Sequence, residues 1–195
     1  MSQTAVSRKV PVAQLVERLG ALPESAFRDI ECIRKVLTEN PVDPKSIEGY
    51  LFWDRQHYTR NLIEKTEVFE LMAVCWDIGH VSSIHNHRDQ NCWMAAPIGR
   101  LMVQNYRVIS KDLKAHCCEI EPTDLVEINR NVPCAVDPAK PVHSVYNPRE
   151  FGERAVSLHV YSHPFDSCEV YSMEKKTCGD IPLVYTSVKG ARVEK

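Results

Sequence analysis

The sequence lacks several features that would indicate particular classes of protein. It has no excess of one charge sign, since the formal net charge is −2 over 195 residues, and it has no polybasic run. We therefore expect no binding of nucleic acid and none of a membrane surface. No apolar run approaches about 20 residues, so we expect no transmembrane helix. The first residues, MSQTAVSRKVPVAQL, lack the apolar core of a secretory signal, and we expect a cytoplasmic protein.

The chain also lacks any CxxC pair, although it contains eight cysteines. A zinc ribbon or a thioredoxin-like redox motif is therefore unsupported. A chain of this length without an export signal is expected to keep its thiols reduced. We expect most of the cysteines to be small core residues, with Cys92 as the exception because it lies in a histidine-rich segment.

Length and composition fit a single domain, which we place at residues 1–195. Residues about 10–48 are expected to be helical, because apolar side chains recur at helical spacing in VAQLVERLGAL and PESAFRDIECIRKVLTEN. From about residue 50 to 185, short runs of β-branched and aromatic residues are separated by Pro, Asn, Asp and Gly. The sequence predicts a mainly β protein with a jelly-roll-like β-barrel and N-terminal α-helices packed outside. Two independent domains are the alternative.

Two histidines one residue apart lie in the glycine-framed segment GHVSSIHNHRDQNCWMAAPIG, residues 79–99. On a strand, His85 and His87 would point to the same face. His143, in PVHSVYNP, is the third candidate ligand. Three neutral imidazoles form a metal site with open positions, and affinity alone does not separate iron from zinc. Four other histidines lack this framing and are expected to be structural or exposed: His57, His80, His116 and His163.

The spacing of the glycine-framed segment resembles the first motif of the cupin superfamily, with Cys92 where that motif usually has an acidic residue. His143 and Asn147 resemble the end of the second cupin motif. Further segments are similar to cysteine dioxygenase, the thiol dioxygenase family with this fold. They are YTRN at 58–61, CWDIGHVSSIHNH at 75–87, SLHVYS at 157–162 and PFDSC at 164–168.

This resemblance implies an enzyme that oxidises L-cysteine with O2 to cysteine sulfinic acid, with both oxygen atoms added to sulfur. It implies that Fe(II) is held by His85, His87 and His143. Arg60 would pair with the substrate carboxylate, because a guanidinium offers a planar fork of donors, and Tyr58 would add its hydroxyl. We expect the protein to be a monomer, as family members usually are.

The resemblance also implies a catalytic row and a covalent crosslink. Tyr161 would point its hydroxyl toward the reacting oxygen or the substrate sulfur, His159 would hold the phenol, and Ser157 would fix the histidine. Cys92 would form a thioether bond to the ring of Tyr161, which gives a protein-derived Cys–Tyr cofactor. The crosslink would remove an oxidisable thiol and fix the position of the phenol.

Some points stay open at this level. Animal members have Ser-Pro directly after the tyrosine, with a cis peptide bond, whereas here Tyr161 is followed by Ser-His-Pro at 162–164. The peptide isomer in this segment is therefore undecided. A related thiol such as 3-mercaptopropionate is the alternative substrate, and a metal-binding cupin without catalysis is the alternative class. Arg60, Cys92 and Tyr161 favour L-cysteine, because relatives that act on 3-mercaptopropionate typically have glutamine at the arginine position and commonly lack the Cys–Tyr pair.

Overall fold

The computed structural model describes residues 9–129, 133–136, 138–139 and 141–194. The expectation that no export signal is present rests partly on residues 1–8, which lie outside the described residues. Within the described part of the chain, no helix combines the length and the apolar character needed to cross a bilayer.

The N-terminal region is helical, as predicted. It contains α1 (Val12–Gly20), the 3-10 helix η1 (Glu24–Arg28), α2 (Ile30–Glu39) and the 3-10 helix η2 (Pro44–Tyr50). A further 3-10 helix, η3, spans Arg149–Phe151. The segment expected as one helix is divided at Asp29, whose backbone is extended and whose side chain accepts hydrogen bonds from the amides of Glu31 and Cys32. Asp29 therefore acts as the N-cap of α2.

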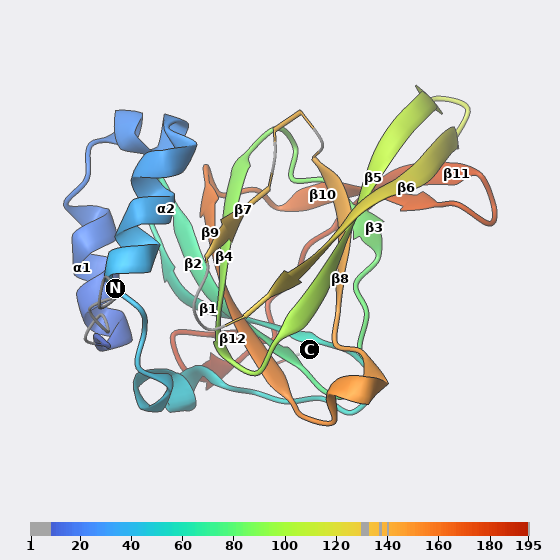
Figure 1. Cartoon of the computed structure of the whole chain (residues 1–195). Coiled ribbons are helices and arrows are strands. Elements are labelled where there is room, and N and C mark those ends of the chain that lie inside the picture. The colour runs from blue at the N-terminus through green and yellow to red at the C-terminus, as the bar shows by residue number, and fades with distance from the viewer. Residues whose placement is uncertain (1–8, 130–132, 137, 140, 195) are drawn as a thin grey trace, which may run out of the picture.

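The rest of the described chain is mainly β and forms two sheets (Figure 1). The seven-stranded sheet has the order β13-β12-β1-β2-β9-β4-β7. Its strands are β1 (Thr59–Lys65), β2 (Glu70–Trp76), β4 (Asn91–Ile98), β7 (Cys134–Ala135), β9 (Ala155–Ser162), β12 (Ser187–Val188) and β13 (Ala191–Arg192). Strands therefore continue to Arg192, beyond the predicted end near residue 185.

The six-stranded sheet has the order β10-β11-β6-β5-β8-β3, and its ladder closes because β10 also pairs with β3. Its strands are β3 (Ile84–His85), β5 (Leu101–Asp112), β6 (Cys117–Ile128), β8 (Val142–Tyr146), β10 (Ser167–Ser172) and β11 (Thr177–Pro182). Among the described strands, every pairing is antiparallel except that of β1 with β12. The predicted β-barrel with helices outside is confirmed.

Strand β2 shows how the seven-stranded sheet is buried on both faces. Leu71 and Ala73 pack in the cluster that contains the helices, whereas Met72, Val74 and Trp76 pack in the cluster inside the barrel. A strand buried on both faces is expected to be a continuous apolar run, as FELMAVCW nearly is. Even-numbered residues of β2 therefore face the barrel interior.

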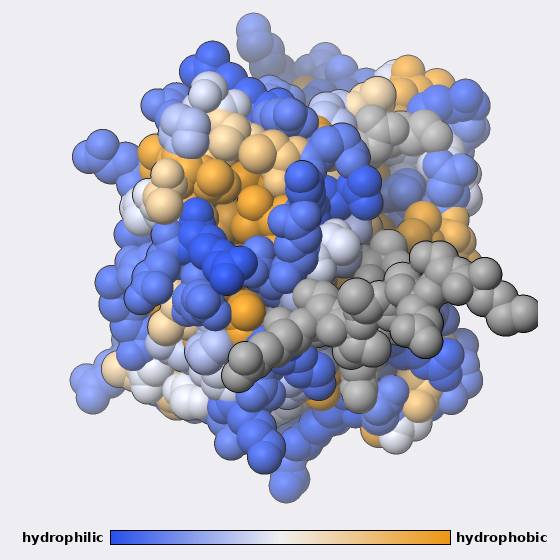
Figure 2. All heavy atoms as spheres, turned by 60° about the vertical axis from the view of Figure 1, so that its left-hand side comes forward, coloured by the Kyte–Doolittle hydropathy of each residue, from blue (hydrophilic) through white to orange (hydrophobic). Residues whose placement is uncertain are grey.

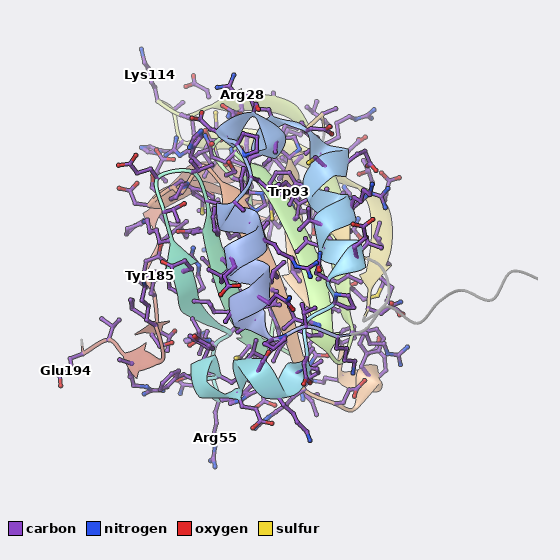
Figure 3. The ribbon with its side chains drawn as sticks, turned by 90° about the vertical axis from the view of Figure 1, so that its left-hand side faces the viewer. Arg28, Arg55, Trp93, Lys114, Tyr185 and Glu194 are labelled. Atoms are coloured by element: carbon purple, nitrogen blue, oxygen red, sulfur yellow. The ribbon has the colours of Figure 1, made fainter. Side chains whose placement is uncertain are left out.

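The helices cover the outer face of this sheet (Figure 1). Leu15, Leu19 and Ile33 are fully buried there, and each contributes roughly 1.5–3 kcal/mol by leaving water. Trp93 of β4 is also fully buried and donates a hydrogen bond from its indole to the carbonyl of Ile30, 2.9 Å away (Figure 3). The outward faces of the helices carry charged residues, and hydrophilic atoms dominate this side of the molecule (Figure 2).

The two glycines that frame the histidine segment both have positive φ. Gly79 has φ +86°, and Gly99 has φ +66°. A Cβ atom at Gly99 would lie 2.7 Å from the carbonyl oxygen of Arg154, so a side chain is excluded there. The side-chain amide of Asn147 donates to three backbone oxygens of neighbouring segments. These motif residues shape the backbone around the histidines.

Candidate active site

Three histidines from separate segments meet at one point inside the barrel. His85 ends β3 and is the cross-strand partner of His143 in β8. His87 lies beyond the end of β3, so the strand position expected for it is wrong, and the chain turns at Arg88 and Asp89, which have positive φ. One ligand atom from each histidine lies within 4.8 Å of the other two.

The three imidazoles fit a non-haem metal site. Burial lowers the pKa of each, and lowers those of His87 and His143 well below the usual range, so the rings are neutral as metal ligands must be. Both ring nitrogens of His87 and Nδ1 of His143 are buried and have no hydrogen-bond partner among the residues that the structure describes. His85 Nδ1 lies 2.8 Å from the carbonyl of Ser83 and donates to it, which leaves Nε2 free as a ligand. A bound metal would give one nitrogen of each ring a partner.

A pocket with about 530 Å³ of empty space is lined by two of the three histidines, His85 and His87. Its polar walls contain six of the residues expected at the site: Tyr58, Arg60, His85, His87, His159 and Tyr161. His143, Cys92 and Ser157 are not among the pocket-lining residues, but each contacts or pairs with a residue that is. Apolar side chains such as Trp76 and Phe165 complete the walls.

Arg60 of β1 lines this pocket and has one guanidinium nitrogen without a hydrogen-bond partner in the described part of the chain. Its side chain is 12% exposed, and its Nη1 is buried without a hydrogen-bond partner. Such a donor fits a ligand carboxylate. Tyr58 lies just before β1, and its ring stacks on that of Trp76 with centroids 4.7 Å apart. Burial raises the pKa of Tyr58, so its hydroxyl stays protonated and able to donate.

The residues behind Arg60 were missed from the sequence. Glu70 is fully buried, and its Oε1 lies 3.8 Å from Arg60 Nη2. The hydroxyl of Tyr185 donates to Glu70 Oε2 at 2.6 Å, and the Arg60 guanidinium lies 5.5 Å from the centroid of the Tyr185 ring. Glu70 is also the cross-strand partner of Tyr161. The sequence did contain a signal for Glu70, because this acidic residue occupies an inward-facing position of the otherwise apolar strand β2.

Alternate residues of β9 form a continuous hydrogen-bonded row. Trp76 Nε1 donates to Ser157 Oγ at 2.9 Å, Ser157 Oγ lies 2.7 Å from His159 Nε2, and His159 Nδ1 lies 2.9 Å from the hydroxyl of Tyr161. Trp76 was not expected in this row. A serine hydroxyl that accepts from the indole can still donate its own hydrogen, and we assign this hydrogen to the bond with His159 Nε2.

That assignment fixes the direction of every bond in the row. His159 then carries its hydrogen on Nδ1 and donates it to the oxygen of Tyr161, whose hydroxyl hydrogen is left to point into the pocket. Burial lowers the pKa of His159 to about 3 and raises that of Tyr161 well above its usual range. Both groups are therefore neutral near pH 7, and with this tautomer the Tyr161 hydroxyl is free to donate a hydrogen bond to a ligand in the pocket.

Cys92 is fully buried on β4 and is the cross-strand partner of Tyr161 on β9. Side chains directly opposite each other in an antiparallel pair have Cβ atoms about 4.5–5.5 Å apart. Burial raises the pKa of the Cys92 thiol well above its usual range, so the sulfur stays protonated. The fold thus places this thiol beside the phenol of Tyr161, in the seven-stranded sheet, whereas His85 and His143 lie in the six-stranded sheet.

The other histidines do not join the site. His57 and His116 are exposed, and His80 accepts a hydrogen bond from the amide of Asp77. His163 is half-buried, with Nδ1 3.0 Å from the carbonyl of Glu67. The peptide bond between Ser162 and His163 is cis, which answers the question of the isomer.

Comparison with known proteins identifies the family to which this arrangement belongs. A sequence model of cysteine dioxygenase type I matches residues 1–174. The chain belongs to this family. Cysteine dioxygenase type 1 from Bos taurus is 31% identical over 194 residues, and that from Danio rerio is 27% identical over 193 residues. Each alignment covers 98% of this chain and 94% of the relative.

Membership of the cysteine dioxygenase family makes the protein an enzyme, and sets aside the alternative of a metal-binding cupin without catalysis.

Among solved structures, the protein TT1209 from Thermus thermophilus is similar over 60% of this chain and 95% of its own, with a TM-score of 0.44 and 15% identity.

Proposed function

We propose that the protein oxidises L-cysteine with dioxygen to cysteine sulfinic acid at a ferrous iron held by His85, His87 and His143. The observation that carries this proposal is a cluster of three neutral imidazoles, two of which line the same pocket as Arg60 with its unpaired guanidinium nitrogen. When bound, ferrous iron supplies the redox-active centre at which the thiol sulfur and dioxygen react. Membership of the cysteine dioxygenase family supports the choice of substrate.

Arg60 binds and orients the substrate through its carboxylate. The free Nη1 donates to one carboxylate oxygen, and the protonated hydroxyl of Tyr58 donates to the same group. The apolar walls beside Trp76 and Phe165 exclude water, which strengthens the ion pair between guanidinium and carboxylate.

Tyr161 holds its hydroxyl hydrogen toward the reacting sulfur and oxygen atoms, in the orientation that His159 and Ser157 impose. We also propose the thioether between Cys92 and Tyr161. A carbon–sulfur bond forms to the ring carbon beside the hydroxyl, the S–H and one ring C–H bond break, and two electrons and two protons pass to dioxygen. The burial of the thiol and its position opposite Tyr161 support this step.

The related thiol 3-mercaptopropionate carries the same carboxylate, and so Arg60 alone does not distinguish it from L-cysteine. The test is aerobic turnover of the iron-loaded protein with each thiol in separate reactions. Sulfinate is detected by NMR, and the intact mass of the protein is followed in parallel. We expect cysteine sulfinic acid together with a loss of two hydrogens from the protein.

If only 3-mercaptopropionate gives sulfinate, the proposed reaction stands and the proposed substrate is wrong. If L-cysteine is turned over at full rate while the protein mass is unchanged, the proposed activity stands and the proposed thioether is wrong. No sulfinate from either thiol would contradict the proposed function.

A further inference from the structure

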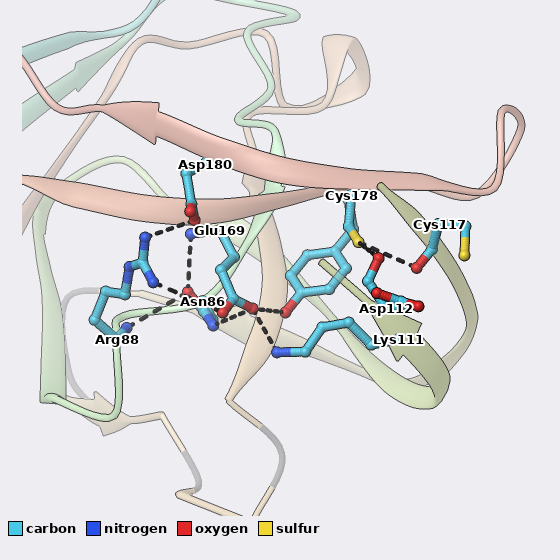
Figure 4. Close-up of polar contacts among 9 residues, drawn as sticks. Asn86, Arg88, Lys111, Asp112, Cys117, Glu169, Cys178 and Asp180 are labelled. Atoms are coloured by element: carbon cyan, nitrogen blue, oxygen red, sulfur yellow. Dashed lines mark hydrogen bonds and ion pairs between the residues drawn. The ribbon is translucent and has the colours of Figure 1, made fainter. Parts of the chain in front are cut away.

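The residue between the two neighbouring histidines, Asn86, turns its side chain away from the pocket. It is 8% exposed, and its amide lies against Glu169 of β10 (Figure 4). Three hydrogen bonds join the two residues. The backbone amide of Asn86 donates to the carbonyl of Glu169 at 3.1 Å, Asn86 Nδ2 donates to Glu169 Oε2 at 3.0 Å, and the backbone amide of Glu169 donates to Asn86 Oδ1 at 3.1 Å.

Glu169 is in turn held by groups from other strands. It is 6% exposed, and its Oε2 accepts hydrogen bonds from Lys111 Nζ at 2.7 Å and from the hydroxyl of Tyr171 at 2.5 Å. Its Oε1 lies 3.8 Å from Nη1 of Arg88, whose Nη2 reaches Asp180 on β11 (Figure 4). The buried carboxylate is thus compensated by cations, as its burial requires. Through it, the histidine segment is connected to β5, β10 and β11.

The histidine segment is also held by the pairing of β3 with β8 and β10, and by a hydrogen bond from the amide of Gln90 to the carbonyl of His87 at 2.9 Å. Strand β3 ends at His85, and both ring nitrogens of His87 lack a hydrogen-bond partner within the described protein. The orientation of the His87 ring is therefore set by its backbone and by packing against the rings of His143, Tyr161 and Phe165. That backbone enters a turn in which Arg88 and Asp89 have positive φ, a conformation that is strained for residues other than glycine. Asn86 Oδ1 also accepts from the amide of Arg88 at 3.4 Å, so the same side chain supports the turn.

We propose that Asn86 and Glu169 are positioning residues of the metal site. They touch neither metal nor substrate. They hold the backbone between His85 and His87 against β10, and so set the affinity and the coordination geometry of the bound metal. The inference rests on the proposed metal site, and it adds a pair of residues that neither the family motif nor the pocket reveals.

The test is an anaerobic titration of the metal-free protein with Fe(II), and with Co(II), whose visible spectrum reports coordination geometry. Asn86→Ala should lower the affinity for both metals by about 10- to 100-fold and shift the Co(II) bands, as is typical when a group that orients a ligand is lost. Glu121→Gln is the control, because it removes one partner of an exposed ion pair with Arg107 on the same sheet. It should leave affinity and spectrum unchanged.

If Asn86→Ala does not fold, a second pair of variants tests the same inference by exchanging the amide of Asn86 and the carboxylate of Glu169. Asn86→Asp places two carboxylates against each other and should weaken metal binding. The double variant Asn86→Asp with Glu169→Gln restores one amide and one carboxylate, and should recover about tenfold or more of the lost affinity. Both variants are checked by circular dichroism.

Wild-type affinity and an unchanged Co(II) spectrum in a folded Asn86→Ala protein would overturn the inference and leave the proposed function standing. An Asn86→Asp defect that Glu169→Gln does not relieve would also overturn it. A wild-type protein that binds neither metal would overturn the proposed metal site, and this inference with it.

Discussion

The two sheets border the same pocket but supply different groups to it. The six-stranded sheet carries His85 and His143, and the third histidine follows its strand β3. The groups expected to bind substrate, to hold a proton or to form the crosslink stand on the seven-stranded sheet: Arg60, Cys92, Ser157, His159 and Tyr161. Metal binding and substrate handling are therefore assigned to different sheets.

The sheets are also held together by different interactions. The seven-stranded sheet is buried on both faces, its row on β9 consists of neutral side chains linked by hydrogen bonds, and its buried carboxylate, Glu70, lies behind the arginine expected to bind substrate. The six-stranded sheet has the long β5–β6 hairpin, which is largely exposed and projects from the body (Figure 1), and it secures the histidine segment through the buried charge of Glu169. Substitutions should therefore separate metal retention from substrate binding, according to the sheet in which they lie.

The largest effect is expected for His143→Ala in the six-stranded sheet. Loss of one of three ligands should reduce the iron content to background and abolish turnover. Metal analysis and the sulfinate assay measure both. His116→Ala, at an exposed histidine of the same sheet region, should change neither. Full iron occupancy in His143→Ala would remove this residue from the metal site.

Arg60→Ala in the seven-stranded sheet should have the opposite pattern. Iron content is expected to stay at the wild-type level, whereas L-cysteine binding should weaken by roughly 2–5 kcal/mol, because a desolvated charge pair loses one partner. Substrate saturation curves measure this change. Arg107→Ala removes an exposed arginine and serves as the control. Unchanged saturation in Arg60→Ala would exclude a contact with the substrate.

The buried His159 ring in the hydrogen-bonded row on β9 should make the free energy of unfolding depend on pH. Burial lowers the pKa of His159 from 6.5 to about 3 in the folded protein, so below pH 6.5 the unfolded chain binds a proton that the folded chain does not. The contribution of His159 to the free energy of unfolding is fully present above pH 6.5. It falls by roughly 1.4 kcal/mol per pH unit as the pH decreases toward 3. The buried ligand histidines act in the same direction in the metal-free protein.

The measurement is urea unfolding of the metal-free protein at pH 7, 6 and 5. His159→Gln should reduce the slope of stability against pH in this range, because the glutamine does not titrate. An identical slope in the two proteins would mean that the His159 ring is not held in its neutral form.

The smallest effect is expected for Cys92→Ala. The crosslink should be lost and the iron retained, while turnover should fall only about 2- to 10-fold, the effect of releasing one immobilised side chain. Cys75→Ala is a matched control, because Cys75 is equally buried in the same sheet but on the face toward the helices. Loss of iron in Cys92→Ala would instead make Cys92 a ligand.

Much of this site was predictable from the resemblance to the cysteine dioxygenase family, together with the side-chain period of two along strands. Ser157, His159 and Tyr161 alternate along one run, and the structure places all three in one hydrogen-bonded row. The same logic misplaced His87, since the strand ends one residue after Ile84 and the ring reaches the site from a turn. The fold class, the helical N-terminus and the family were predicted and are confirmed. Fe(II), the thioether, the monomeric state, the cytoplasmic location and the absence of nucleic-acid or membrane partners stay predictions.

The partners of the site residues were not predictable, because they lie far away along the chain. Trp76 and Ser157 are 81 residues apart, Asn86 and Glu169 are 83 apart, and Tyr185 lies 115 residues from Glu70. No local pattern in the sequence indicates which strands become neighbours or in which register.

The sequence by itself determined which residues alternate on each strand, which faces are apolar and which side chains are suited to bind a metal or a carboxylate. These properties follow from local backbone geometry and from the chemistry of single residues. The tertiary structure alone decided that Glu70 flanks Tyr161 and that Glu169 lies behind the histidine segment. The physical reason is that strand register results from the free energy of the whole packed barrel, to which many distant contacts contribute together.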